Sequence, residues 1–228
     1  MALTNPNVLV RMPVADDLWL ITYDQWAPKH TVSDPVLSYG VAAALVAELV
    51  LGRCAVVNHA GHTPGLTVKG AEFEPLDPVL KDLLHLITND GWRPVKEWIR
   101  YAARNAVHDV AGRLCVRELL LPVEVGTLRK RIAWQAASPK ASTAIDYRPG
   151  RVAAMLGADQ HRAFAVHGIE DVALVALCDA LGLRHRLLVD GVRESHTYID
   201  QVQLRLAHER PDVFVVVQAL GEMAGTSR

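Results

Sequence analysis

The residues best suited to metal chemistry lie close together in one predicted turn. His59 and His62 are three residues apart, and Cys54 precedes them in the same stretch. Structural zinc sites use four Cys or His ligands, usually as two closely spaced pairs. No second pair with this spacing follows, and a close pair is expected by chance in a chain with ten histidines. The sequence therefore predicts no metal site.

Cysteine is also the best candidate for a nucleophile. Cys115 follows His108 by seven residues, which is two turns of one helix and too far for a direct thiol–imidazole hydrogen bond. Cys54 and Cys178 lie in apolar runs, where burial raises the pKa of a thiol instead of activating it. No GxSxG, Walker A or GxGxxG motif occurs. We expect no catalytic residues and no cofactor, so the chain is not an enzyme.

The composition is that of an ordinary globular protein. The chain has 228 residues, half of them apolar, and a net charge of −1, which argues against a nucleic-acid surface covering the whole protein. Three scattered cysteines predict buried free thiols in a reducing compartment. No signal peptide is visible, and the longest apolar run, from Val41 to Leu51, is roughly half of the 20 or so residues that a membrane span needs. These features predict a cytoplasmic protein or one peripheral to the inner face of a membrane.

Cationic side chains are the remaining functional candidates. A basic stripe recurs at about four-residue spacing on a predicted helix, at Arg93, Lys96, Arg100, Arg104 and His108. A second group lies in a predicted hairpin, at Arg129, Lys130 and Arg131, beside the apolar residues Leu119, Leu120, Leu121 and Trp134. Such a hairpin could insert apolar groups in a membrane interface while its cations meet anionic lipid, at roughly 1 kcal/mol per cation. A solvated basic face and a hairpin packed on the core are the alternatives.

Two predicted units, each a helix followed by a short β-hairpin, position these residues. The first runs from Ser38 to Val68 and breaks at Gly52, a residue typical of helix C-termini. The second, weaker copy runs from Trp98 to Trp134. The predicted fold class is mainly α, with apolar central helices ringed by amphipathic helices and two helix-plus-hairpin units that resemble winged helices. The helices before the hairpins lack groove-reading Arg, Asn and Gln, so we expect no nucleic-acid partner.

The remaining elements are predicted mostly as helices. One helix is expected from Val95 to about Arg117, a loop over 138–149, and helices over 150–164 and 183–189. Pro211 begins a last helix, and its run of β-branched residues leaves a strand as the alternative. The chain from Met223 onward is predicted to fray. We expect one domain over residues 1–228. Its N-terminal helix–hairpin half covers about 15–136 and its C-terminal helical half about 150–222.

The order and spacing of these segments resemble the Golgi phosphoprotein 3 family, in its bacterial, actinobacterial-type members. The similarity runs from about Ala15 to Leu220 and depends on no single motif. It is carried by the segments DDLWLITYD, SYGVAAALVAELVLGR, LDPVLKDLLHLI, WRPVKEWIRYAARNAVHDVAGRL, the hairpin ending in RKRIAW, and EDVALVALCDALGL. The resemblance implies a mainly helical, non-enzymatic protein that binds phosphatidylinositol 4-phosphate, with a hairpin dipping into the lipid. Eukaryotic members also bind the cytoplasmic tails of Golgi glycosyltransferases.

Under this resemblance the headgroup pocket is only partly retained. The family's Trp before the central helix corresponds to Ser33, and its Arg early in that helix to Ala42. The two Arg residues of the later helix correspond to Arg104 and Val107. Arg104 is kept, with Arg100 as a stand-in, so several charge-assisted contacts of roughly 1.5–3 kcal/mol each are lost. We expect weak or altered headgroup selectivity.

The resulting hypothesis is peripheral association with anionic, phosphoinositide-like lipid through Arg100, Arg104 and the cations Arg129 to Arg131. The first alternative is a soluble interaction or regulatory module of the same fold that binds no lipid, and the second is a winged-helix-like nucleic-acid binder. The hairpin could also pair two copies of the chain. The sequence identifies no protein partner. Lipid association and the soluble module are distinguished by one observation, which is whether these cations share a face with an exposed apolar hairpin tip.

Overall fold

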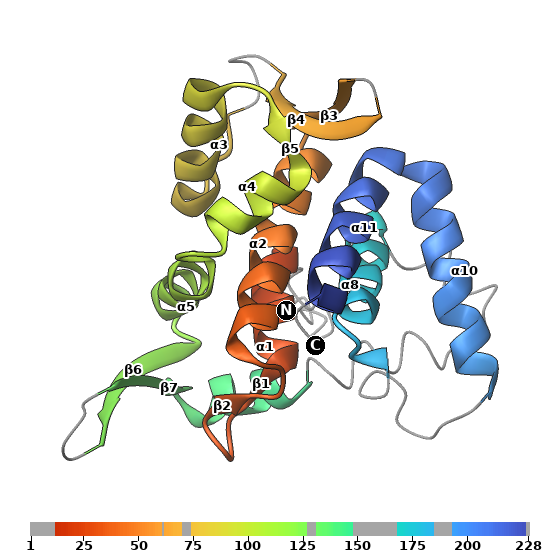
Figure 1. Cartoon of the computed structure of the whole chain (residues 1–228). Helices are drawn as coiled ribbons and strands as arrows, with labels where there is room; N and C mark the ends of the chain where they lie inside the picture. The colour runs from red at the N-terminus through yellow and green to blue at the C-terminus, as the bar shows by residue number, and fades with distance from the viewer. Residues whose placement is uncertain are drawn as a thin grey trace, which may run out of the picture.

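The computed structural model describes residues 12–60, 62–69, 74–126, 131–147, 168–184 and 193–226. Within these ranges the chain is mainly helical with small antiparallel sheets (Figure 1), which confirms the predicted fold class at this level. The helices are α1 (Val14–Thr22), α2 (Asp34–Leu51), α3 (Pro78–Asp90), α4 (Val95–Ala102), α5 (Ala106–Val116), α8 (Ile169–Ala180), α10 (Arg193–Glu209) and α11 (Pro211–Thr226). The strands are β1 (Tyr23–Asp24), β2 (Lys29–His30), β3 (Ala55–Ala60), β4 (Thr63–Val68), β5 (Arg93–Pro94), β6 (Leu120–Val125) and β7 (Arg131–Ala136).

Helix α2 contributes many of the buried apolar side chains. Pro35 lies in its first turn and Gly52 at its C-cap, the positions that these residue types favour. Val46 and Leu49 are fully buried, and α2 packs against α1, α4, α5, α8 and α11. Each Leu or Val buried in this way stabilises the fold by about 1.5–3 kcal/mol. The packing of α2 therefore connects elements from both ends of the described chain.

By length and composition alone, α2 is a helix that could cross a membrane. The sequence prediction considered only the uninterrupted apolar run from Val41 to Leu51, whereas this test takes the whole helix from Asp34. Of the α2 residues, 67% are buried inside the protein, as in a core helix. Length and apolarity therefore do not distinguish a span from a core helix here.

Helices α2 and α5 are each followed by an antiparallel hairpin, as predicted. Strands β3 and β4 pair over six residues each, and the short strand β5 pairs with the other edge of β4. Strands β6 and β7 form a separate two-stranded ribbon that extends away from the helices, at the lower left of Figure 1. The comparison of these units with winged helices stays a prediction.

The single helix predicted to run to about Arg117 is wrong, because two helices replace it. The N–H of Arg104 donates to the Tyr101 carbonyl at 3.3 Å, and the N–H of Asn105 donates to the Ala102 carbonyl at 3.2 Å. These shorter turns interrupt the α-helical ladder and form a corner between α4 and α5. Asn105 then occupies the N-cap position of α5, where Asn is favoured. The predicted basic stripe is therefore divided among strand β5, which holds Arg93, the two helices and their corner.

Two further predictions in the last third of the chain need correction. Residues 139–147 are helical and not a loop, because the Ser138 hydroxyl accepts the N–H of Ala141 at 3.1 Å and starts a helix. The last element, α11, is a helix and not a strand, and it continues to Thr226 without fraying at Met223. The Met223 side chain is only 5% exposed, so its burial holds this end of the helix in place.

Part of the predicted organisation is untested. The helices predicted over 150–164, and most of the one over 183–189, lie outside the described residues. The single domain over 1–228 and its division into two halves also stay predictions.

Gly65 of β4 lies where a larger residue would not fit. A Cβ at this position would lie 2.4 Å from the Trp92 ring and 2.7 Å from the backbone oxygen of Arg93 in β5. We expect Gly65→Ala to lower the free energy of unfolding by about 1–3 kcal/mol in urea denaturation. Gly112→Ala in α5 is the control. Nothing lies within 4 Å of its added Cβ, so we expect a gain of about 0.4–1 kcal/mol. Equal effects of the two substitutions would contradict this account of β4.

Candidate functional site

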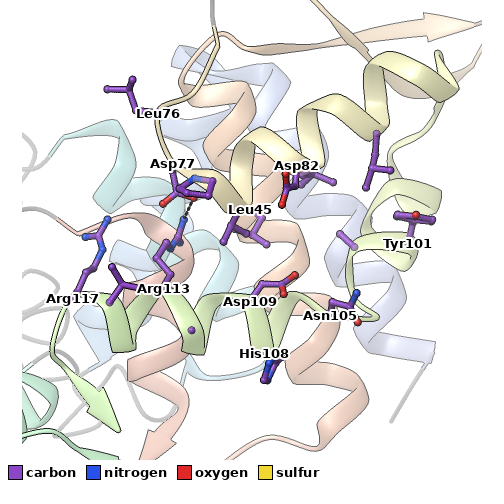
Figure 2. A pocket seen from close by; sticks show the side chains of 17 residues that line it. Leu45, Leu76, Asp77, Asp82, Tyr101, Asn105, His108, Asp109, Arg113 and Arg117 are labelled. Atoms are coloured by element: carbon purple, nitrogen blue, oxygen red, sulfur yellow. Dashed lines mark ion pairs between the residues drawn. The ribbon is translucent and has the colours of Figure 1, made fainter. Parts of the chain in front are cut away.

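A buried arginine connects four helices. Arg113 of α5 is 7% exposed, and its guanidinium contacts a carboxylate from each of α1 and α2 and the N-cap carboxylate of α3. Its Nε lies 2.6 Å from Asp16 Oδ1, and its Nη1 lies 3.2 Å from Glu48 Oε2 and 3.2 Å from Asp77 Oδ1 (Figure 2). The Ala15 N–H also donates to Glu48 Oε1 at 2.6 Å. We call Asp16, Glu48, Asp77 and Arg113 the Arg113 cluster.

The Arg113 cluster contains more carboxylates than guanidinium groups, and the pKa values follow from that imbalance. Desolvation raises the pKa of Glu48 to about 7 and also raises the pKa of Asp16. The charge of Arg113 is shared among three carboxylates and only partly offsets this effect. For Arg113 itself, desolvation lowers the pKa, but the charges of the three carboxylates outweigh it and hold the pKa above its ordinary value. The guanidinium therefore stays charged while Glu48 titrates near neutral pH.

A second feature is a small cavity where Arg104 meets the β6–β7 hairpin. Its volume is about 250 Å³, and it lies between the start of α2, the α4–α5 corner and strand β7. The side chains that line it include Ser38, Arg104, Asn105, Val107, His108, Ile132 and Trp134. The Arg104 guanidinium carbon lies 5.2 Å from the centroid of the Tyr101 ring, and this cation–π contact restrains it. We call this feature the Arg104 cavity.

The Arg104 cavity combines several groups that favour a negatively charged ligand. Arg104 is exposed, and within the described ranges no carboxylate pairs with it. Asn105 and His108 bring the first turn of α5 to the same cavity, and the Asn105 side chain makes no capping hydrogen bond. The N-terminus of a helix carries unpaired N–H groups and a partial positive charge. A cation and a helix N-terminus at one cavity suit a phosphate or a carboxylate.

The other predicted cations are not brought to this cavity by the part of the chain that is described. Arg100 is exposed on the last turn of α4 but does not line the Arg104 cavity. Arg129 and Lys130 lie outside the described residues, and only the backbone of Arg131 is described, in β7. The prediction that these cations converge with the hairpin tip is therefore untested.

The prediction that the hairpin presents its apolar residues to a membrane is partly wrong. Leu120 is fully buried, whereas Leu121 is 45% exposed and Ile132 on the partner strand is 58% exposed. Successive side chains of a strand point to opposite faces, so Leu120 and Leu121 cannot both face the solvent. The exposed side chains of Leu121 and Ile132 lie on opposite faces of the ribbon, because Leu121 pairs with Gln135 and Ile132 with Glu124, so they form no common apolar surface.

The three substituted family positions occupy different environments. Ser33 is the exposed N-cap of α2, and Ala42 is fully buried in the core, where an arginine side chain would not fit without rearrangement. Val107 lines the Arg104 cavity, and its carbonyl accepts the indole N–H of Trp19 at 3.2 Å. Of these three positions, only Val107 borders the cavity.

The histidines and cysteines considered as metal ligands or nucleophiles lie in different environments. His59 and His62 are exposed, and in the described ranges no group of three or more His, Cys, Asp or Glu side chains could hold a metal ion. Cys54 and Cys178 are buried free thiols as predicted, but Cys115 is only half-buried. Burial raises the pKa of all three thiols, which disfavours the nucleophilic thiolate.

Sequence reasoning missed several residues of these two features. Ser38 was not predicted to line a cavity, and His108 was noted in the basic stripe and as a rejected partner of Cys115, but not as a cavity residue. His108 follows Arg104 by four residues, a spacing at which side chains meet on one face of a helix. Arg113 was also missed, although it follows Val110 by three residues and so lies on the apolar face of α5. A charge on a buried face requires a partner, and that is the signal that could have identified the Arg113 cluster.

Comparison with known proteins gives one clear match. Residues 14–220 match the sequence model of the protein family described as Golgi phosphoprotein 3 (GPP34). The match covers nearly the whole chain, including every residue of the Arg113 cluster and the Arg104 cavity. A comparison with curated proteins gives no match.

Removal of the guanidinium should strongly destabilise the protein. Arg113→Ala leaves three carboxylates without their shared cation, so we expect the free energy of unfolding to fall by about 3–5 kcal/mol in urea denaturation. Arg117→Ala is the control, because the Arg117 side chain is 37% exposed and its Nε lies 3.4 Å from Asp16 Oδ2. We expect that loss to stay within about 1 kcal/mol. Similar losses for both variants would show that the Arg113 cluster does not hold the helices together.

The raised pKa of Glu48 predicts a pH-dependent stability. The folded-state pKa is about 7 and the ordinary value is 4.5, so between these values the folded protein binds more protons than the unfolded chain. The free energy of unfolding should therefore fall as pH rises through this window, by up to about 1.4 kcal/mol per pH unit. The raised pKa of Asp16 acts in the same direction, and the charges of Arg113, Asp77 and Arg117 face the same cluster. Urea unfolding of Glu48→Gln from pH 5 to 7.5 should show a smaller slope than the wild type, and equal slopes would refute the assignment.

Proposed function

The chain belongs to the Golgi phosphoprotein 3 family, and from this premise we propose that it is a peripheral membrane-binding protein that recognises anionic lipid. The observation that carries the proposal is the Arg104 cavity. It joins an exposed cation, the N-terminal turn of α5 and the hairpin residues Ile132 and Trp134. A peripheral protein needs both an electrostatic and an apolar contact with the bilayer, and here the two kinds of group are adjacent.

The size of each contribution explains why the two contacts must act together. A charge-assisted hydrogen bond from Arg104 to a phosphate is worth roughly 1.5–3 kcal/mol, and a cation near an anionic surface adds about 1 kcal/mol. Burial of the exposed Ile132 side chain in the acyl region would add about 1.5–3 kcal/mol at most. Neither contribution alone gives stable attachment.

The expected ligand is a phosphoinositide-like headgroup bound with modest selectivity. Arg104 supplies the permanent positive charge of the cavity, and Ser38 and Asn105 supply hydrogen-bonding groups. The predicted cations Arg100, Arg129, Lys130 and Arg131 would add attraction to the surface without fixing the headgroup. The proposed location is the cytoplasmic side of a membrane, and the proposed activity is binding without catalysis.

Vesicle sedimentation tests this function. The full chain is mixed at low salt with phosphatidylcholine vesicles, alone or with phosphatidylserine or phosphatidylinositol 4-phosphate added at equal negative charge. We expect sedimentation with both anionic mixtures and loss of binding as salt rises, because screening weakens the attraction. Arg104→Gln should lower the affinity about tenfold or more, because it removes a charge-assisted contact.

Arg53→Gln is the matched control. Arg53 is exposed just after α2, at the end of that helix opposite Ser38, so its replacement removes the same charge far from the Arg104 cavity. We expect this variant to bind vesicles like the wild type. No sedimentation with any anionic vesicle at low salt would refute the proposal and favour a soluble interaction module. Salt-sensitive binding to a DNA fragment would favour the nucleic-acid alternative instead.

A further inference from the structure

A larger cavity lies beside the Arg113 cluster and shares Asn105 and His108 with the Arg104 cavity. It has a volume of about 920 Å³ and runs between α3 and α5, with α4 at one end. Leu45 of α2 forms its floor, and Val79, Leu83 and Val116 are among its apolar walls (Figure 2). We call it the α3–α5 groove. Its volume lies in the range of about 300–1,000 Å³ that small-molecule sites occupy.

Two carboxylates face each other across this groove. Asp82 projects from α3 and Asp109 from α5, and both side chains point into the space between the helices (Figure 2). In the described part of the chain, neither carboxylate makes a hydrogen bond or an ion pair. Desolvation raises the pKa of Asp109, the adjacent His108 lowers it, and the charge of Asp82 raises it again. Both carboxylates are exposed to solvent and line the same cavity.

The cations at the other end of the groove do not neutralise this pair. Arg113 is occupied by the three carboxylates of its cluster, and Arg117 contacts Asp16 at 3.4 Å. His108 also lines the groove, next to Asp109 along α5, and counts as neutral in the formal charge. The unpaired charge in the groove is therefore negative, and it stands over an apolar floor. A bound group that restores the balance must carry positive charge.

From this geometry we propose that the α3–α5 groove binds an amphiphilic amine, with its ammonium group between Asp82 and Asp109 and its apolar chain along Leu45, Leu83 and Val116. The ammonium group has three donors and can bond to both carboxylates. The apolar chain gains from burial against side chains that are otherwise exposed at the groove mouth, such as Val116, which is 84% exposed. A bare metal ion fits less well, because the described residues offer no third acidic, His or Cys ligand there.

Isothermal titration calorimetry with simple probes tests this inference on the full chain. The probes are n-octylamine, 1-octanol, octanoate and n-propylamine, each below its aggregation concentration at neutral pH. We expect octylamine to bind at least about tenfold more tightly than octanol or octanoate, because only the amine pairs with the carboxylates. It should also bind more tightly than propylamine, because the longer chain buries more apolar surface.

Isosteric variants locate the site. The double variant Asp82→Asn, Asp109→Asn keeps the shape of the groove and should lose at least about tenfold in octylamine affinity. Val116→Ser should lose about fivefold, because it removes apolar contact without altering charge. Asp146→Asn, an exposed acid on the 139–147 helix, is the matched control and should bind like the wild type. Thermal unfolding of each variant confirms that it is folded.

Several outcomes would overturn the inference. Octanol that binds as tightly as octylamine would show that the groove recognises no charge. An unchanged affinity in the double variant would place the amine elsewhere. Calcium that binds alone and displaces octylamine would make the groove a simple cation site. Arg104→Gln should leave octylamine binding intact, so failure of the lipid proposal and failure of this one give different results.

Discussion

Arg113 holds three carboxylates in a region from which water is largely excluded, and these contacts set the positions of α1, α2, α3 and α5. A buried ion pair contributes little net stability when it is intact, because desolvation cancels much of the attraction. The ion pairs instead oppose movement of a helix, because any displacement leaves a buried charge without a partner. The Arg113 cluster therefore fixes which helices are neighbours more than how stable they are together. Ala15 adds to this constraint by donating its N–H to Glu48 at 2.6 Å.

Helix α5 is the element through which this constraint reaches both candidate sites. Its last turn is held by the Arg113 cluster, its first turn lines the Arg104 cavity, and the face carrying Asp109 lines the α3–α5 groove. Asn105 and His108 border both spaces. The two sites thus share a wall but differ in sign, with an unpaired cation in one and unpaired carboxylates in the other. The two proposed ligands, of opposite charge, would therefore lie against adjacent parts of one helix.

The sequence predicted the helical character, the two hairpins and the family, because these depend on patterns that are local or spread along the whole chain. The break between α4 and α5 was missed, since an Asn inside an apolar helical period only weakly signals a helix end. Arg104 was identified through the resemblance, but Ser38 and Trp134 join it through packing between segments about 70 and 30 residues away. The Arg113 cluster was missed for the same reason, because its four members come from four elements. The periodicity of apolar residues shows which face of a helix is buried, but it does not show which charged side chains meet there.

The corner between α4 and α5 has consequences for how related proteins can diverge. Arg104 and Asn105 are exposed at this corner, outside the core that α2 and the Arg113 cluster organise. Exchange of an exposed side chain typically changes stability by no more than about 0.5 kcal/mol. Selection can therefore alter the charge and hydrogen-bonding groups presented there with little effect on folding. A change of residue at this corner would therefore alter the Arg104 cavity and leave the scaffold in place.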